Sequence, residues 1–250
     1  MEHIKRFTGR AQDYTLGRPY YPEALLDHLY QELGLSERSV IADIGAGTGK
    51  FTRLLLERGS TVYAVEPNED MREVAVRELS SYETFHPVAG TDVASCLPEQ
   101  SVALVTVAQA FHWFDGESFR RECQRILKPG GKVALIWNMR HLLSPENEAV
   151  LKVYQRYCAD FHGFNGGIQK DDVRIRRFFR DEYQTMTVHN PLIYDKEKFI
   201  RRSLSSSYSL KADDEQYESY LSALEAVFDQ YAVAGKLMVT NETVMYVGGV

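Results

Sequence analysis

A glycine-rich turn followed by a carboxylate is the feature of this sequence best suited to chemistry. The turn, Gly45-Ala46-Gly47-Thr48-Gly49, follows a mostly apolar, β-branched run and precedes a helix-compatible stretch at 50–58. Glycines let a ligand approach the backbone closely, and the helix start beyond them presents free N–H groups with positive partial charge. The next apolar run ends in Glu66, where a carboxylate would meet a ribose diol. The pattern predicts a nucleoside-cofactor site.

The spacing of the glycines separates this turn from two other nucleotide-binding turns. A dinucleotide fingerprint has the form G-x-G-x-x-G, whereas this turn is G-x-G-x-G with Asp43 two residues before it. A phosphate-binding P-loop needs a glycine at position 44 and Ser or Thr directly after Lys50, and the sequence has Ile44 and Phe51 there. The P-loop is therefore excluded, and the dinucleotide fingerprint is absent.

The composition describes a globular chain without an excess of positive charge. Of its 250 residues, 44% are hydrophobic and 26% are charged, and the formal net charge is −6. These values allow one large domain or a core with an appendage, and they disfavour a nucleic-acid-binding protein. No apolar stretch reaches the roughly 20 residues of a membrane span, and no signal core is present. We expect no nucleic-acid partner, no membrane span and a cytoplasmic location, with monomer and homodimer both open.

The cysteines and histidines predict neither disulfides nor a metal site. Cys96, Cys123 and Cys158 lie far apart with no C-x-x-C pair, which is typical of reduced thiols. The seven histidines show no metal-ligand spacing, so no metal is expected.

Strand-like and helix-like segments alternate in the first half of the chain, which is typical of βα units around a parallel sheet. Strands are expected at 40–44, 61–66, 84–89, 102–108 and 132–137, and helices at 22–33, 50–58, 68–79 and 117–127. Lys128-Pro129-Gly130-Gly131 is expected to form a turn that stops the last of these helices. Further on, 145–180 looks helical, 183–194 indicates one strand, 213–232 an amphipathic helix and 242–247 a strand.

Several motifs together resemble class I S-adenosylmethionine-dependent methyltransferases. They are the D-x-G-x-G-x-G run with Glu66 ending the next strand, Gly90-Thr91-Asp92, the run 108–114, the turn 127–131 and the N-terminal segment 14–22. Within that class, the chain is similar to the small-molecule branch that includes the ubiquinone/menaquinone-biosynthesis type and the trans-aconitate type. The resemblance covers nearly the whole chain. It implies an α/β fold, with a Rossmann-like, doubly wound, mostly parallel seven-stranded sheet and an added helical lid.

The same resemblance suggests how the chain is divided. It implies an N-terminal helical lid segment at 1–35, a cofactor-binding α/β core at 36–140, a helical insertion at 141–182, and C-terminal strands and a helix completing the sheet at 183–250. In the family, the first and third of these parts cover the carboxyl edge of the sheet, so 141–182 is expected to cover the acceptor site.

The resemblance also implies which residues hold S-adenosyl-L-methionine and its product, S-adenosyl-L-homocysteine. Glu66 matches the acid that accepts both ribose hydroxyls, and Gln109 matches the position beside the point of methyl transfer. Many relatives have Ala-Glu where this chain has Asp92-Val93, so the side chain that meets the adenine amino group is left open, and Met71 could equally be a core residue. The implied cofactor-binding residues are Asp43, Gly45, Ala46, Gly47, Glu66, Pro67, Asn68, Met71, Thr91, Asp92, Val93 and Gln109.

His112 is the candidate catalytic residue, as a general base for a hydroxyl or carbon acid. The alternative is that His112 supports the loop after the fourth strand. The residues expected to bind the acceptor are Tyr14, Arg18, Tyr21, Trp137 and Asn138. The aromatic rings offer apolar area, and Arg18 offers a forked donor for a carboxylate, although Tyr14 and Arg18 could instead anchor the N-terminal helix.

The implied activity is the transfer of a methyl group to an oxygen or carbon of a small-molecule acceptor. In-line attack on a sulfonium neutralises its charge in the transition state, so strong acid–base chemistry is not obligatory. Two alternatives remain. One is a nucleoside-cofactor-binding protein without methyl transfer, and the other is an NAD-dependent oxidoreductase, whose G-x-G-x-x-G fingerprint the chain lacks.

Overall fold

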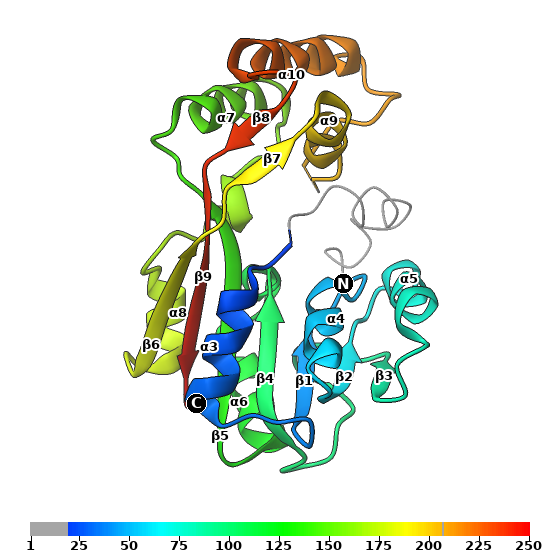
Figure 1. Ribbon diagram of the computed structural model, residues 1–250, viewed down its shortest axis with the longest axis vertical. Helices are drawn as coiled ribbons and strands as arrows, with labels where there is room; N and C mark the ends of the chain where they lie inside the picture. Colours follow the sequence, from blue (N-terminus) through cyan, green and yellow to red (C-terminus); the bar gives the residue numbers. More distant parts are fainter. Residues whose placement is uncertain (1–19, 207) are drawn as a thin grey trace.

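The centre of the protein is a seven-stranded sheet, which is mostly parallel (Figure 1). The structure is a computed structural model and describes residues 20–206 and 208–250. The strand order is β3-β2-β1-β4-β5-β9-β6, and only β9 (Asn241–Gly248) runs antiparallel to its neighbours. The other strands are β1 (Val40–Ile44), β2 (Thr61–Val65), β3 (Phe85–Val88), β4 (Val102–Ala108), β5 (Leu127–Arg140) and β6 (Tyr183–His189). The predicted Rossmann-like, seven-stranded fold is confirmed.

Helices cover both faces of the sheet, so its central strands are buried on both sides. Along β5, Val133, Leu135 and Trp137 belong to one apolar cluster, whereas Ala134 and Ile136 belong to the other. Successive residues of a strand point to opposite faces, so this alternation assigns each cluster to one face. One face carries α3 (Glu23–Leu33), α4 (Lys50–Glu57) and α5 (Glu69–Leu79), and the other carries α6 (Gly116–Ile126) and α8 (Val173–Phe179).

A second layer of structure, which we call the cap, lies beyond the carboxyl end of β5 (Figure 1). Its helices and its two-stranded ribbon bury a third apolar cluster of their own, which includes Tyr154, Phe199 and Tyr220. The chain passes between sheet and cap four times, from β5 to α7, from α7 to α8, from β6 to β7 and from β8 to β9. The cap comprises α7 (Pro145–Tyr157), β7 (Leu192–Tyr194), α9 (Lys196–Leu204), α10 (Tyr217–Tyr231) and β8 (Leu237–Val239).

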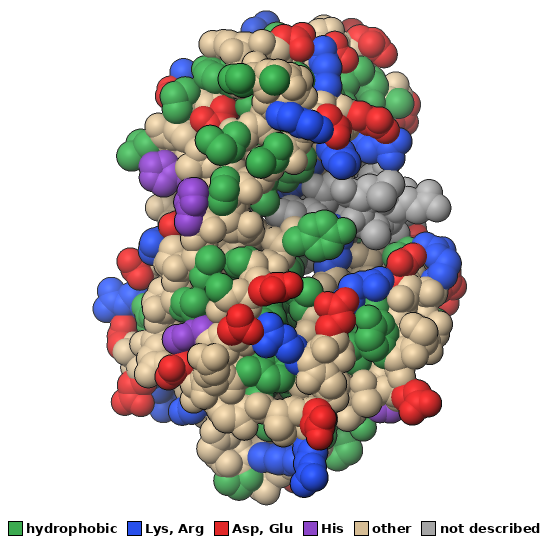
Figure 2. Space-filling model, viewed as in Figure 1, with side chains coloured by type: hydrophobic (Ala, Val, Ile, Leu, Met, Phe, Trp, Pro, Cys, Tyr) green, Lys and Arg blue, Asp and Glu red, His purple; other side chains and the backbone are tan. Residues whose placement is uncertain are grey.

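The surface mixes charges of both signs, and Figure 2 shows acidic and basic side chains interspersed over one face. Arg58 lies 2.6 Å from Asp27, and Lys196 lies 3.0 Å from Asp229, both at the surface. Exposed pairs of this kind contribute only about 0–1 kcal/mol each. Stability therefore depends mainly on the apolar clusters. Across residues 20–206 and 208–250, no helix combines the length and the apolar character needed to cross a bilayer.

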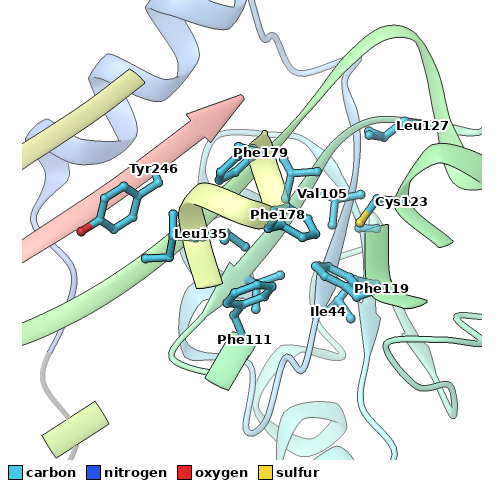
Figure 3. Close-up of a cluster of buried hydrophobic side chains, with 14 of the residues drawn as sticks. Ile44, Val105, Phe111, Phe119, Cys123, Leu127, Leu135, Phe178, Phe179 and Tyr246 are labelled. Atoms are coloured by element: carbon cyan, nitrogen blue, oxygen red, sulfur yellow. The ribbon is translucent and has the colours of Figure 1, made fainter. Parts of the chain in front are cut away.

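Several aromatic rings pack together in the cluster between the sheet and the helices α6 and α8 (Figure 3). Phe119 is fully buried and stacks on Phe178, with 5.4 Å between ring centroids. Phe111 meets Phe178 edge to face at 5.0 Å, and its ring also lies 6.1 Å from that of Trp137. These rings fix the 3₁₀ helix η1 (Phe111–Trp113), which follows β4, against α8.

Three local expectations differ from the structure. The segment Lys128-Pro129-Gly130-Gly131 is a bulge within β5 and not a turn before it, because Leu127 pairs with Val102 and the next pairing joins Lys132 to Leu104. The single strand expected at 183–194 is divided into β6 and β7, because Pro191 has no N–H with which to continue the ladder. The helix α9 and the strand β8 were not anticipated.

The segment 141–182 divides between the two layers. Its helix α7 packs against α10 in the cap, whereas α8 packs against α6 beside the sheet. The short helix η2 (Phe164–Gly167) lies between them and contacts both η1 and β5.

Asp43 ties β1 to a helix and to a neighbouring strand. Its Oδ2 accepts a hydrogen bond from Thr52 Oγ1 of α4 at 2.6 Å, and its Oδ1 accepts one from Thr106 Oγ1 of β4 at 2.9 Å. Asp43 is only 1% exposed, and burial raises the pKa of its carboxyl to about 6, although both hydroxyls lower it. The side chain therefore joins the three elements that meet where the strand order reverses.

The aromatic cluster yields a first prediction. Phe119→Ala should lower the free energy of unfolding by about 3–5 kcal/mol, because the change leaves a cavity among packed rings. Leu143→Ala is the control, since Leu143 is 87% exposed. That variant should stay within about 0.5 kcal/mol of the parent. Urea unfolding followed by circular dichroism measures both. Equal effects would contradict the assigned core.

Asp43 yields a second prediction, concerning pH. The folded protein keeps a proton on Asp43 up to about pH 6, whereas the unfolded chain loses it near 3.8. The stabilisation from this group is thus present at low pH and is lost as the pH rises through that window. Asp43→Asn removes the titration. The free energy of unfolding of the parent, minus that of the variant, should fall by about 2–3 kcal/mol between about pH 4 and pH 7. Urea titrations at several pH values measure this difference, and a constant difference would refute the prediction.

Candidate functional site

The glycine turn lies at the carboxyl end of β1 and is pressed against the tip of β4. Gly45 has a φ of 72°, and its N–H donates to the carbonyl of Val65 at 2.9 Å. A Cβ at Gly45 would lie 2.7 Å from the Cβ of Ala110 and 3.3 Å from Cζ of Phe114. Both the backbone conformation and the close approach therefore require glycine at this position. The turn, the end of β2 and the loop after β4 meet here.

Glu66 bridges the end of β2 and the glycine turn. Its Oε2 accepts a hydrogen bond from the N–H of Gly47 at 2.8 Å, and its Oε1 accepts one from the N–H of Asn68 at 2.8 Å. Burial raises the pKa of Glu66, while these two N–H groups and the charge of Arg72 lower it. Each carboxylate oxygen has a second lone pair, so two further acceptor positions remain for the hydroxyls of a ligand.

The residues expected around the adenine differ in how accessible they are. Asn68 caps α5, since its Oδ1 accepts from the N–H of Met71 at 3.0 Å, and Met71 is only 3% exposed. In the loop after β3, the N–H of Ala94 donates to Thr91 Oγ1 at 3.1 Å. Val93 is 49% exposed, and burial, with the nearby charge of Asp115, raises the pKa of Asp92. Asp92 and Val93 therefore lie nearer the solvent than Met71 does. Pro67, also in the predicted set, follows Glu66 directly and is half-buried.

Gln109 occupies a strained position at the tip of β4. Its φ is 62°, which is a left-handed conformation that costs a residue other than glycine about 1–3 kcal/mol. Its N–H donates to the carbonyl of Ile136 at 2.9 Å, and its Nε2 donates to the carbonyl of Asn138 at 3.4 Å. These bonds to β5 hold the strained backbone, and such strain is concentrated at functional sites.

The residues predicted to contact the acceptor fall in different places. Trp137 is fully buried between Phe111 and Tyr246, so it lies in the core and not at the edge of the sheet. Its neighbour Asn138 points to the opposite face and is 6% exposed. The ring of Tyr21 meets Phe51 edge to face at 5.0 Å. Tyr14 and Arg18 lie outside the described residues.

A polar network surrounds Asn138 where the sheet meets the cap. Asn138 Oδ1 accepts from Thr243 Oγ1 at 2.6 Å and from Asn190 Nδ2 at 3.3 Å. Asn190 Nδ2 also donates to Thr243 Oγ1 at 3.0 Å and to the carbonyl of Tyr20 at 3.1 Å. Sequence reasoning missed Asn190 and Thr243, and no local pattern marks either of them. Thr106, the partner of Asp43, did have a signal, because it is the one hydroxyl in the aliphatic strand β4.

His112 belongs to η1 and lies on the side of α6 and α8. Its ring centroid is 4.7 Å from that of Trp113. It lines a pocket of about 240 Å³ formed by η1, the start of α6 and α8. Besides this candidate catalytic residue, the pocket has no lining residue from the predicted cofactor and acceptor sets.

Metal and disulfide chemistry find no support in the part of the chain that the structure describes. No group of three or more His, Cys, Asp or Glu side chains there is arranged to hold a metal ion. Cys123 and Cys158 are buried free thiols, and Cys96 is an exposed one.

Comparison with known proteins finds a family match for part of the chain and several relatives. Residues 42–135 match the family model described as a methyltransferase domain. A methyltransferase-like protein of Schizosaccharomyces pombe, itself uncharacterized, is 37% identical over 162 residues, which is 64% of this chain and 62% of that protein. A protein of Saccharomyces cerevisiae, named as a probable S-adenosylmethionine-dependent methyltransferase, is 30% identical over 149 residues, 58% of this chain and 50% of that one. The chain thus spans less than two thirds of the length of these relatives.

Solved structures agree with the observed topology. A protein from Anabaena variabilis, assigned as a methyltransferase of an antibiotic biosynthesis pathway, superposes with a TM-score of 0.65 at 21% identity. The alignment covers 92% of this chain and 98% of that one, so the likeness extends through the sheet and the cap. Residues 42–135 therefore match a methyltransferase domain, and the chain shares the fold of this solved structure.

Proposed function

We propose that the protein transfers a methyl group from S-adenosyl-L-methionine to an oxygen or carbon of a small-molecule acceptor. The observation that carries this proposal is the bridge formed by Glu66, which accepts hydrogen bonds from Gly47 and Asn68 at 2.8 Å each. The bridge brings a carboxylate and a glycine turn into one cradle. A ribose diol and a charged, phosphate-free amino-acid moiety fit such a cradle better than a pyrophosphate does.

The residues present fit that cofactor. The remaining lone pairs of the Glu66 carboxylate would accept the two ribose hydroxyls, and the open backbone at Gly45–Gly47 would lie against the amino-acid end. Asp92 and Val93 are the accessible candidates beside the base. Asp43 would support the glycine turn without touching the cofactor, because both its oxygens already accept hydrogen bonds from threonine hydroxyls and almost none of its surface is exposed.

The chain's own contribution to the reaction is placement and exclusion of water. When bound, S-adenosylmethionine supplies an electrophilic methyl group on a sulfonium, and its carbon–sulfur bond breaks as S-adenosylhomocysteine forms. Gln109, fixed by its bonds to β5, would border the point of transfer. Alignment of two reactants in a dry site can supply about 7–11 kcal/mol of the acceleration in favourable cases. A carboxylate acceptor would need no base, whereas a hydroxyl or carbon acid would.

A small-molecule acceptor is supported by the cap and by the charge of the chain. The cap lies beyond the carboxyl end of β5, and the polar network around Asn138 joins it to the sheet (Figure 1). The net charge of −6 and the interspersed charges in Figure 2 give no field that would attract a nucleic acid. The predicted contacts at Tyr14, Arg18 and Tyr21 remain part of this proposal.

The proposal is tested by supplying S-adenosylmethionine and a fractionated metabolite extract. Release of S-adenosylhomocysteine, together with a product heavier by one methylene unit in mass spectrometry, would support methyl transfer. Binding of the cofactor without release in any fraction would favour a cofactor-binding protein. Turnover of NAD in its place would favour an oxidoreductase.

The Glu66 bridge gives the third prediction. Glu66→Ala should weaken the binding of S-adenosylhomocysteine by at least about 10–100-fold, because the loss of even one charge-assisted hydrogen bond costs about 1.5–3 kcal/mol. Glu69→Ala is the matched control, since Glu69 is an exposed acid in the first turn of α5. Isothermal calorimetry measures both variants. Unchanged affinity in Glu66→Ala would remove the central assignment.

The position of His112 gives the fourth prediction. We expect His112→Ala to weaken cofactor binding and to lower the melting temperature, because η1 supports Phe114, whose ring borders Gly45. A general base would behave differently, with a chemical rate lowered by roughly 10²–10⁴-fold and the affinity preserved. Cofactor titration combined with single-turnover kinetics separates the two roles. His141→Ala, at an exposed histidine, is the control.

A further inference from the structure

The pocket that His112 lines has the features of a ligand site, and none of the residues assigned to the cofactor or the acceptor lines it. It opens between η1, the first turn of α6 and α8, and its volume is about 240 Å³. The rings of Phe111, Phe114 and Phe178 line it, together with the side chains of Arg174 and Arg177. The pocket is thus aromatic on one side and cationic on another.

The aromatic side is rigid, and the half-buried ring of Phe114 is the one most open to a ligand. Phe111 and Phe178 pack edge to face at 5.0 Å, and both are almost fully buried (Figure 3). Phe111 also lies 6.4 Å from Phe114 in an edge-to-face arrangement. A cavity of roughly 150 Å³ lined by apolar side chains is enough to bind benzene. The volume here leaves space for a six-membered ring and a polar substituent.

The charges around the pocket do not cancel. Arg174 is neutralised by Asp172, which accepts hydrogen bonds from its Nε at 2.9 Å and its Nη2 at 2.8 Å. The one acid in the lining, Glu117, lies 3.8 Å from Arg121. Arg177 forms no ion pair with any carboxylate among residues 20–206 and 208–250. One positive charge is left at the rim.

We propose that this pocket binds a small aromatic carboxylate, with its ring against the phenylalanines and its carboxylate on Arg177. A guanidinium offers two parallel donors that match a carboxylate, and apolar walls favour a flat ring. The site lies across Phe114 from the glycine turn, because the tip of that ring borders Gly45. Its lining includes none of the residues of the cradle around Glu66, and the inference does not depend on the proposed reaction.

The test uses benzoate as the probe and benzamide as its uncharged counterpart. Binding to the full chain is followed by ligand-observed NMR titration. Benzoate should bind saturably, at least about fivefold more tightly than benzamide. Arg177→Gln should abolish that preference. Arg176→Gln should keep it, because Arg176 lies outside the pocket lining and its Nε donates to Asp181 at 2.7 Å.

A second variant fills the pocket. A Cβ at Gly116 would meet only Phe111 Cζ, at an ordinary 3.7 Å, so Gly116→Leu should fold and should displace both probes. Absence of saturable benzoate binding would overturn the proposal, as would equal affinity for the two probes, or equal losses in the two arginine variants. Competition by S-adenosylhomocysteine would also overturn it, by placing benzoate in the cofactor cradle. Failure of S-adenosylhomocysteine to bind would count against the proposed function alone.

Discussion

The hydrogen bonds of Asp43 are the interaction on which the rest of the site depends. Its carboxylate draws Thr52 of α4 and Thr106 of β4 onto β1, and the glycine turn begins two residues later. If these bonds were absent, β4 and α4 would be joined to β1 only by backbone pairing and apolar contacts. A buried carboxylate is costly unless hydrogen-bonded, and both oxygens are satisfied here. The buried carboxyl of Asp43 thus fixes the position of β1, from which the glycine turn at 45–49 starts.

Glu66, at the end of the next strand, likewise fixes the backbone around it through hydrogen bonds to a buried carboxylate. Its two oxygens order the backbone of Gly47 and Asn68 before any ligand arrives, so the turn and the end of β2 already have a defined separation. Gln109 completes the arrangement from β4, where a strained backbone is held by β5. Less ordering is then left for a ligand to induce, which lowers the entropic cost of binding.

Local features were predictable from the sequence, and long-range ones were not. The sequence revealed the turn at Gly45–Gly49, the acid at Glu66 and Asn68, the N-terminal capping residue of helix α5. Each of them acts within a few residues of its own strand or helix. The partners of Asn138 come from 52 and 105 residues away, beyond any spacing rule. The burial of Trp137 could not be predicted either, because β5 is covered on both faces and its apolar run does not reveal which side chains reach the edge of the sheet.

The position of β9 within the sheet affects how the molecule can assemble. This strand lies between β5 and β6, although β6 precedes it in the chain. On a ribosome, β6 therefore emerges with no strand to pair with, and β7, α9, α10 and β8 of the cap follow before β9 appears. Until then, β5 presents an open ladder edge, which is a template for unwanted strand pairing. Completion of the sheet is thus a late, non-local step, and the nascent chain passes through an aggregation-prone stage.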